Sequence, residues 1–404
     1  MTEEPQTYEE IMKKHNIDSK FLPNNNANQN SNSVNQTQSY TQNYLKNQLP
    51  QGVQIGSEDD AELLKFIEES KPKIYIVGAG GGGCNTLSRV AEIGIQGVNL
   101  VASNTDVQHL VKTRAKRKIL LGKKLTQGLG AGSNPEVGEN AAKESMDELK
   151  KSFEDASMVF LTCGLGGGTG TGSLPVIAQA AKAMGALTVA VVTLPFTSEG
   201  RTRMHNALQG LEKLQKQADT TIVIPNDKLL TIAPDLPLNT AFKVSDEVLA
   251  GAVKGIAELI TKPGMVNLDF ADLKTILKDA GCAAIGIGEA SIEAKPDQRA
   301  MIAIETALNS PLLDIDITTA DKALINVIGG EDMSLKEAEI IMKEVSNRIS
   351  PSSHIIWGAR IEDNIKKSTL RVLVVIAGTK MPKYTLENLE RKSVEEELDL
   401  DLVG

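Results

Sequence analysis

The sequence predicts an α/β protein with a parallel sheet covered by helices on both faces, followed by a long helix and a smaller α+β domain with a mixed sheet. Two observations lead to this fold class. Apolar strand segments alternate with helical stretches through the first half of the chain, which is typical of a buried parallel sheet. Beyond the long helix the spacing of apolar segments changes, which indicates a second domain.

The first half is expected to alternate strands and helices. Strands are predicted at residues 74–78, 98–103, 118–121, 158–163, 186–193 and 221–225, and helices at 85–94, 138–153, 173–184 and 203–217. The long helix is predicted over about 240–262, because Lys262-Pro263-Gly264 is a helix stop signal. In the second block we expect strands at 282–290, 322–329, 353–361 and 369–378 and helices at 297–308 and 334–349.

The composition places the chain among ordinary soluble proteins. It has 404 residues, 41% of them hydrophobic and 24% charged, which is enough for two domains with cores. A net charge of −9 argues against a general nucleic-acid binder. Cys84, Cys163 and Cys282 are too far apart for a disulfide framework or a zinc site. No segment resembles a membrane span or a signal peptide, so we expect a cytoplasmic protein.

The N-terminal segment, residues 1–56, differs from the rest. It is rich in Asn, Gln and Ser and nearly uncharged, so it is expected to be disordered. Residues 8–12 can form a short helix that docks a partner or a membrane surface, although a frayed end is the simpler interpretation. Ser57 and Asp60 resemble a capping box, so order is expected to begin there.

Two glycine-rich segments carry the main functional signal. The first is Gly78-Ala79-Gly80-Gly81-Gly82-Gly83-Cys84-Asn85, and the second is Gly164-Leu165-Gly166-Gly167-Gly168-Thr169-Gly170-Thr171-Gly172. Glycine-dense turns between a buried strand and a helix expose backbone N–H groups at the positive end of that helix, where phosphate binds. Two such loops, with the Thr169 and Thr171 hydroxyls on the second, indicate a nucleoside triphosphate.

The first loop alone leaves alternatives open. Gly78, Gly80 and Gly83 satisfy G-x-G-x-x-G, and Asp106 follows about 20 residues later, as in a Rossmann oxidoreductase that binds NAD. A purely structural turn is a further alternative. The chain lacks G-x-x-x-x-G-K-[ST], which disfavours a P-loop NTPase. A third glycine segment at 128–135 is a surface loop on its own, but three such loops on one sheet edge favour a shared phosphate cradle.

An acidic segment after the long helix is the second informative feature. It places Asn267, Asp269 and Asp272 at the start of a helix. From the spacing alone, helix-terminal charges with Asp269 as the cap are the simplest interpretation. These residue types can also orient a water or a metal for phosphate hydrolysis. A whole helix separates them from the glycine loops, so we expect them to lie far from the nucleotide of their own protomer.

Taken together, these motifs resemble the FtsZ family, the tubulin-related GTPases of prokaryotic cell division, from about residue 74 to 379. The second glycine loop is similar to the family's signature loop. Residues 102–106, 128–138 and 195–203 resemble its other nucleotide loops, and residues 267–273 resemble its synergy loop. The resemblance implies a tubulin/FtsZ-like fold. Its expected parts are a disordered extension (1–56), a Rossmann-like GTP-binding domain (57–239), a central helix (240–265), a C-terminal activation domain (266–380) and an acidic tail (381–404).

The resemblance also implies site residues. The nucleotide would be bound by Gly81, Gly82, Gly83, Cys84, Asn85, Gly168, Thr169, Gly170, Glu199, Arg203, Asn226 and Asp246. Glu199 and Arg203 would contact the ribose and phosphate side, while Asn226 and Asp246 would read the guanine. A carboxylate suits guanine, because it accepts from N1–H and N2–H₂ groups that adenine lacks.

By the same resemblance, Asn267, Asp269 and Asp272 would be catalytic and would act on the nucleotide of the next subunit, which explains their distance from the loops. The implied activity is hydrolysis of GTP to GDP and phosphate, with Mg²⁺ held mainly by the nucleotide and no metal site of the protein's own. A head-to-tail contact that does not close generates a filament, so a homopolymer is expected. A cell-shape protein related to tubulin, a non-hydrolysing scaffold and the oxidoreductase remain as alternatives.

The chain also departs from the family. Cys84 stands where another glycine is usual, and residues 241–247 look more archaeal than bacterial. The usual Pro-rich, basic partner-binding peptide is absent from the C-terminal tail. The alternating Leu and Asp of residues 398–402 suit an added edge strand on a receptor sheet, with a solvated acidic tail as the equal alternative. Division-ring or membrane-tether proteins are therefore expected partners, with localisation at midcell.

Overall fold

The computed structural model describes residues 66, 71–232, 237–262, 264–266, 268–290, 296–313, 315–362 and 369–379. The expectations for the extension, the tail and Asn267 lie outside these residues. So does most of the helix expected from Ser57, of which Phe66 alone is described and is helical. The chain divides into two compact units, and the fold belongs to the larger unit, which contains Lys73–Gly404.

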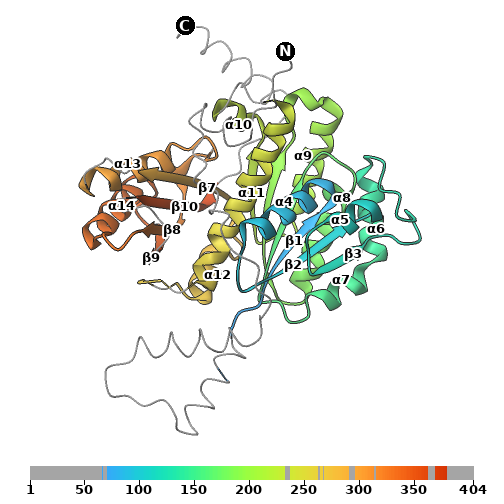
Figure 1. The fold of residues 1–404 in the computed structure, drawn as a ribbon, viewed down its shortest axis with the longest axis horizontal. Helices are drawn as coiled ribbons and strands as arrows, with labels where there is room; N and C mark the ends of the chain where they lie inside the picture. The colour runs from blue at the N-terminus through green and yellow to red at the C-terminus, as the bar shows by residue number, and fades with distance from the viewer. Residues whose placement is uncertain are drawn as a thin grey trace, which may run out of the picture. The chain divides into compact units, whose positions relative to one another are not determined.

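One sheet of ten strands runs through the larger unit, in the order β3-β2-β1-β4-β5-β6-β7-β10-β8-β9 (Figure 1). The strands are β1 (Ile74–Ala79), β2 (Val98–Asn104), β3 (Arg117–Leu120), β4 (Met158–Gly164), β5 (Leu187–Leu194), β6 (Thr220–Pro225), β7 (Gly281–Ala290), β8 (Lys322–Gly329), β9 (His354–Ile361) and β10 (Leu370–Thr379). The helices are α4 (Gly80–Ile93), α5 (Val107–Lys112), α6 (Pro135–Glu144), α7 (Met146–Ser152), α8 (Thr169–Ala183), α9 (Arg201–Gln215), α10 (Asp227–Ile232), α11 (Leu238–Thr261), α12 (Phe270–Leu277), α13 (Pro296–Leu308) and α14 (Leu335–Arg348).

The first six strands form the predicted parallel half. Successive residues of these strands face opposite layers, because side chains alternate along a strand. Ile76 and Phe160 belong to the core under α4 and α11, whereas Val77 and Leu161 belong to the core under α6, α7, α8 and α9. Both faces are therefore covered, which explains why these strands are apolar throughout.

The second half is mixed, as predicted, but it is not a separate sheet. β7 pairs in parallel with β6 over three residue pairs, from Thr220↔Gly281 to Ile222↔Ala283, and so joins the two halves. β10 is antiparallel to both β7 and β8, and β9 is a parallel edge strand beside β8. α13 and α14 cover one face of this half.

The long helix α11 links the two halves through its apolar side. It contributes Val253 and Ile256 to a core that also contains strand residues of the second half, Leu373 and Val375 among them. The approach is close: a Cβ placed on Gly255 would lie 2.3 Å from a methyl carbon of Leu373. One helix therefore lies between the two halves and contributes to a core shared by both (Figure 1).

The structure differs from the predicted elements in three places. The helix expected at 138–153 is two helices, α6 and α7, which meet at Ser145, whose hydroxyl accepts a hydrogen bond from the Gly122 N–H. α4 and α8 begin earlier than expected, because glycines form their first turns. The short helices α5 and α10 were not predicted. Among the described residues, no helix combines the length and apolarity that crossing a membrane requires.

Candidate functional site

Three glycine-rich segments meet at the carboxyl ends of the parallel strands, as the sequence predicted. A Cβ placed on Gly80 would lie 2.6 Å from the backbone nitrogen of Gly170, so the loops after β1 and β4 touch. A Cβ placed on Gly168 would lie 2.7 Å from the backbone nitrogen of Asn134, which brings the segment after β3 against the second loop. Side chains at these glycines would fill the space between the loops. The three loops therefore form one surface that consists almost entirely of backbone, called the glycine edge below.

The loops lead directly into helices, so helix N-termini converge on this edge. α4 and α8 have no acidic residue in their first turns, which leaves their positive ends uncompensated within those turns. Gly81, Gly82 and Asn85 are exposed at the start of α4, whereas Gly83 is buried. A Cβ on Gly83 would lie 2.4 Å from the Thr162 carbonyl oxygen. This arrangement suits an anion with several phosphates.

The two threonines of the second loop have different roles. The Thr169 hydroxyl lies 2.6 Å from the Thr105 hydroxyl, at the exit of β2, and is partly accessible. The Thr171 hydroxyl is buried and accepts a hydrogen bond of 2.8 Å from the Gly166 N–H. The Thr171 hydroxyl therefore braces its own loop, and its donation to phosphate stays a prediction. A contact between the Thr169 hydroxyl and phosphate also stays a prediction.

Cys84 and Asp106 are both occupied by structural contacts. The Cys84 thiol is buried 3.8 Å from each of the Gly78 and Ser103 carbonyl oxygens, and burial raises the pKa of this thiol to about 11. Only the backbone of Cys84 can therefore face a ligand. The Asp106 carboxylate accepts from two backbone N–H groups and caps α5, the use expected of an N-cap rather than of a ribose ligand.

Glu199 and Arg203 lie beside the second loop. The Glu199 carboxylate accepts from the Phe196 N–H at 2.8 Å and pairs with the Arg203 guanidinium at 2.9 Å. A Cβ on Gly166 would lie 2.9 Å from the Arg203 carbonyl oxygen, so the start of α9 contacts the glycine edge. The structure thus brings both residues to the predicted place. Their contacts to ribose or phosphate stay a prediction.

Asn226 and Asp246 converge from the end of β6 and from α11. The Asn226 amide oxygen accepts a hydrogen bond of 2.8 Å from the Ser245 hydroxyl, and the Asp246 carboxylate accepts one of 3.0 Å from the Thr86 hydroxyl on α4. Burial raises the pKa of the Asp246 carboxyl to about 7, and the hydrogen bond from Thr86 opposes that rise. A partly buried carboxylate beside an amide can discriminate between bases by hydrogen bonding.

The acidic segment lies at the other end of α11. Asp269 and Asp272 cap α12 reciprocally: the Asp272 N–H donates to Asp269 at 2.8 Å, and the Asp269 N–H donates to Asp272 at 3.2 Å. The capping interpretation is therefore confirmed, and it leaves Asp269 exposed and Asp272 partly exposed. Figure 1 shows α12 and α10 at opposite ends of α11. That helix has 24 residues, or about 36 Å at a rise of about 1.5 Å per residue.

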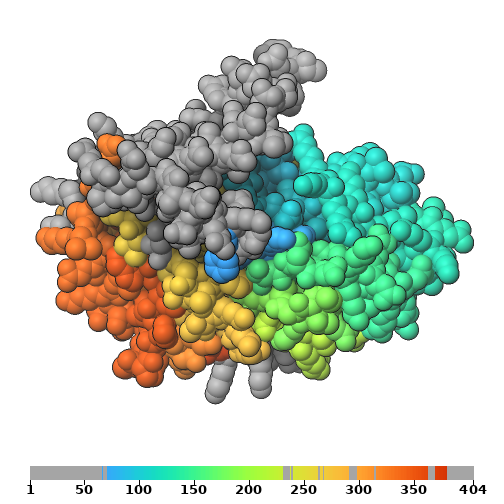
Figure 2. All heavy atoms as spheres, turned by 90° about the horizontal axis from the view of Figure 1, so that it is seen from below, coloured from blue at the N-terminus to red at the C-terminus, as the bar shows by residue number. Residues whose placement is uncertain are grey.

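Figure 2 views the molecule from the acidic end. The gold surface around α12 lies between the green helices of the first half and the orange elements of the second. Among the described residues, no group of three or more His, Cys, Asp or Glu side chains could hold a metal ion. In the described part of this segment, the Asp269 side chain is exposed and the Asp272 side chain is partly exposed.

Sequence reasoning missed three side chains of the nucleotide edge. Thr86 and Ser245 orient the two predicted base-reading residues, and Thr105 pairs with Thr169. No local pattern marks Thr86, because its partner Asp246 is 160 positions away. Ser245 stands next to the predicted Asp246, and Thr105 lies within the nucleotide loop predicted at residues 102–106, although no role was predicted for either side chain.

Two family models match this chain. The GTPase-domain model of the Tubulin/FtsZ family matches residues 73–234, and the C-terminal domain model of the FtsZ family matches residues 281–380. The protein named cell division protein FtsZ 1 of Thermococcus kodakarensis is 54% identical over 355 residues, which cover 86% of this chain and 94% of that protein.

Solved structures agree with the family models. The FtsZ dimer of M. jannaschii is 56% identical, with a TM-score of 0.74 over 80% of this chain and 93% of that one. The GTPγS-bound protofilament of CetZ2 from Haloferax volcanii has a TM-score of 0.67 over 81% of this chain and 99% of that one, and at 22% identity it shows the shared fold alone.

The fold and the glycine edge therefore define a GTPase of the tubulin/FtsZ class. Within that class, the chain belongs to the FtsZ family and is similar to the archaeal FtsZ 1 proteins of cell division. The predicted family and fold are confirmed. The oxidoreductase alternative is wrong, because the matched GTPase domain includes the loop that suggested it.

Proposed function

We propose that this chain stacks head to tail into filaments of the cell-division ring and hydrolyses GTP at each contact between subunits. The observation that carries this proposal is the separation of the two half-sites. The glycine edge and the carboxylates of Asp269 and Asp272 lie toward opposite ends of α11 in one protomer. A head-to-tail stack brings Asp269 and Asp272 of one subunit onto the glycine edge of the next, where the nucleotide would be bound.

In this arrangement the phosphates lie against the backbone of Gly81, Gly82, Gly168 and Gly170, at the starts of α4 and α8, and Thr169 donates its hydroxyl. Backbone N–H groups and helix dipoles stabilise the negative charge without any lysine. Mg²⁺ would be held mainly by phosphate oxygens and would neutralise charge between them.

The guanine would lie between Asn226 and Asp246. Ser245 occupies the Asn226 oxygen, which orients the amide nitrogen as a donor for guanine O6. Ionised Asp246 would accept from N1–H and N2–H₂. Adenine offers neither pattern, so this pair explains a preference for GTP over ATP. Glu199 and Arg203, held together by their ion pair, would contact the ribose and the phosphate side.

The acidic pair would orient the attacking water. Within the capping box each carboxylate uses one oxygen, Oδ1 of Asp269 and Oδ2 of Asp272. The second oxygen of each can accept from a water, and the box keeps both side chains in one geometry before the neighbour arrives. Such preorganisation is what positioned general bases require. Asn267 would assist from the same segment.

The test is sedimentation with phosphate release followed in parallel, using GTP and magnesium and, separately, GDP, ATP and NADH. Of these nucleotides, only GTP with magnesium should make the protein pellet as polymer, and the polymer should disperse as GTP is consumed. GTP binding without assembly at high protein concentration would contradict the filament and favour a scaffold. The solved relative described as an FtsZ dimer, at 56% identity, supports self-assembly.

Filaments of this kind would act at midcell, in the cytoplasm, tethered to the membrane by partner proteins. The tail that would bind such a tether lies outside the described residues. Relatives at 54% identity are named for cell division, which favours the division role over a cell-shape role. Deleting residues 395–404 should leave assembly in solution unchanged and abolish recruitment in cells. Normal localisation of that variant would contradict the proposed tether.

A further inference from the structure

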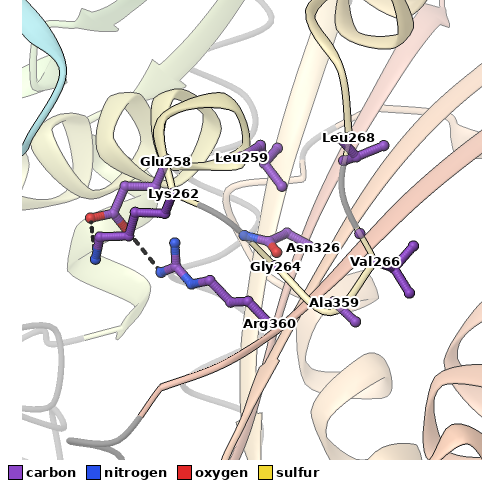
Figure 3. Close-up of a pocket in the computed structure, with 10 residues that line it drawn as sticks. Glu258, Leu259, Lys262, Gly264, Val266, Leu268, Asn326, Ala359 and Arg360 are labelled. Carbon is purple, nitrogen blue, oxygen red and sulfur yellow. Dashed lines mark hydrogen bonds and ion pairs between the residues drawn. The ribbon is translucent and has the colours of Figure 1, made fainter. Parts of the chain in front are cut away.

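The end of α11 is tied to the edge strand β9 by a buried ion pair. The Arg360 guanidinium on β9 lies 2.8 Å from the Glu258 carboxylate in the last turn of α11, and both side chains are more than nine-tenths buried. Figure 3 shows this pair beneath the helix, with Lys262 on the far side of the same carboxylate. Breaking such a pair costs more than breaking a surface pair, because neither charge can turn to water.

The connection from α11 to α12 lies on the same strand. Val266 and Ala359 exchange two backbone hydrogen bonds, of 3.0 and 3.2 Å. Gly264 also packs closely against β9, since a Cβ on this residue would lie 2.7 Å from the Ala359 carbonyl oxygen. One step further, the Leu268 side chain fills the space over Gly358, whose Cβ would lie 3.0 Å from a Leu268 methyl carbon.

Three consecutive residues of β9 thus hold three successive points of the chain. Arg360 holds the end of α11, Ala359 holds the connection and Gly358 supports Leu268, the residue directly before Asp269. We propose that Arg360 is a positioning residue for hydrolysis, which sets the register of α11 on β9 and thereby aims the Asp269–Asp272 cap at the neighbour's nucleotide. This inference rests on the proposed hydrolysis across the subunit contact.

The surroundings of Arg360 argue for positioning rather than simple stability. Among the described residues, its Nε and Nη1 groups have no hydrogen-bond partner. The adjoining cavity is about 10 Å³, room for about one water, and the Asn326 amide lines it. A buried guanidinium that uses one nitrogen for its main contact is an expensive way to stabilise a fold.

Glu258 does not depend on Arg360 for neutralisation. Lys262, the residue that directly follows α11, lies 2.8 Å from the other Glu258 oxygen. Although burial acts to raise it, Lys262 and Arg360 together hold the pKa of Glu258 below its usual range. Removing Arg360 therefore leaves a paired carboxylate on α11. What is lost is the direct pair between Glu258 and β9, while the Lys262–Glu362 pair of 3.4 Å, at the residue that follows β9, remains.

The test compares Arg360→Met with Arg371→Met in the full-length protein. Arg371 pairs with Glu289 at 3.0 Å between β10 and β7, so its loss removes the same charge from the same domain away from the loop. In Arg360→Met, kcat for GTP should fall by about tenfold, while KM and the affinity for GTP stay within about twofold. Arg371→Met should match the parent protein.

Two further variants separate positioning from folding. Arg360→Lys retains a cation that can reach Glu258 and should recover most of the lost kcat. Gly264→Ala presses a methyl group against the Ala359 carbonyl oxygen without altering any charge, and it should reproduce the loss. If Arg360→Met does not fold, the Gly264→Ala variant provides the test. GTP turnover by Gly264→Ala equal to that of the parent protein would then overturn the inference.

Asp272→Asn distinguishes this inference from the function on which it rests. If Asp272→Asn is inactive and Arg360→Met turns over normally, the positioning role is wrong and hydrolysis across the contact stands. If Asp272→Asn retains normal turnover, the proposed hydrolysis itself fails. A loss of GTP affinity in Arg360→Met equal to its loss of kcat would also overturn the positioning role.

Discussion

In the proposed function, the two ends of α11 serve one reaction by different physical means. At the nucleotide edge the contacts are backbone groups at helix N-termini, held by glycines whose substitution would make adjacent loops collide. At the acidic end the groups are two exposed side chains on a reciprocal helix cap. Backbone contacts bind any polyphosphate and need no partner. Under the proposal, the exposed carboxylates have no substrate until another subunit supplies one, so nucleotide binding and hydrolysis should be separable by mutation.

The largest expected effect comes from removing the acidic end. Asp272→Ala should lower kcat by at least about 100-fold, the contribution expected of a positioned general base, with GTP affinity within about twofold. Phosphate release under assembling conditions and nucleotide binding measure the two quantities. Asp272→Asn is the matched control, because its amide oxygen can still cap α12. It should be as inactive as the alanine variant if charge is what matters.

Mixing sharpens the same comparison. Asp272→Ala keeps an intact nucleotide edge, and Asp246→Asn keeps an intact acidic end. At GTP concentrations where neither is active alone, a mixture should recover turnover at contacts that join the two intact halves. If the mixture does not recover GTP turnover, hydrolysis across the subunit contact is ruled out. The same conclusion would follow if monomers hydrolysed GTP at a rate per protomer that is independent of protein concentration.

Asp246→Asn should weaken GTP binding by roughly 10- to 150-fold, because it removes charge-assisted hydrogen bonds worth about 1.5–3 kcal/mol. Xanthine nucleotides offer a carbonyl where guanine has its amino group, and an Asn side chain can donate to it. The variant should therefore gain relative affinity for XTP. Competition binding with GTP, XTP and ATP measures this, and an unchanged order of affinities would contradict the role of Asp246 in base reading.

Thr169→Ala should weaken nucleotide binding by about tenfold, since it removes one hydroxyl donor to phosphate. Thr171→Ser is the useful comparison, because it keeps the hydroxyl that braces Gly166 and should change affinity little. Equilibrium binding of a fluorescent GTP analogue measures both. A loss in Thr171→Ser equal to that in Thr169→Ala would show that the loop is sensitive to any change of side chain, and would contradict a specific phosphate contact of Thr169.

GTP affinity should also depend on pH through Asp246. Burial raises the pKa of this carboxyl to about 7 in the free protein, so its protonated fraction grows as pH falls through that value. Base reading needs the ionised form, so affinity should fall on acidification by up to about tenfold per pH unit. Asp246→Asn should lose this dependence, and subtracting its profile removes the titration of the nucleotide itself. Parallel profiles for the two proteins would contradict the assignment.

The smallest effect is expected from deleting residues 1–56. Their composition cannot form a packed core, and the first family match begins at residue 73. GTP binding and turnover should stay within about twofold of the full-length protein, with any change confined to bundling or localisation. Loss of nucleotide binding would show that the GTP-binding domain begins earlier than residue 57.

Local sequence properties were sufficient for the strands, the long helix and the glycine loops. Hydrophobic periodicity and glycine clustering act over a few residues, so the predicted bounds of β1, β4 and β8 agree closely with the observed ones. The sequence did not show that α6 and α7 separate at Ser145, because that break coincides with a contact to Gly122. Nor did it show that β6 and β7 join the two halves into one sheet.

The sequence by itself determined which residue types could bind a triphosphate and which could orient a water, and their family resemblance. Tertiary structure alone decided which side chains meet: Thr86 with Asp246 across 160 positions, Thr105 with Thr169 across 64, and Arg360 with Glu258 across 102. Such pairs depend on strand order and on how α11 packs against both domains. Periodicity carries no information about either, because it reports which side of an element is buried and not what buries it.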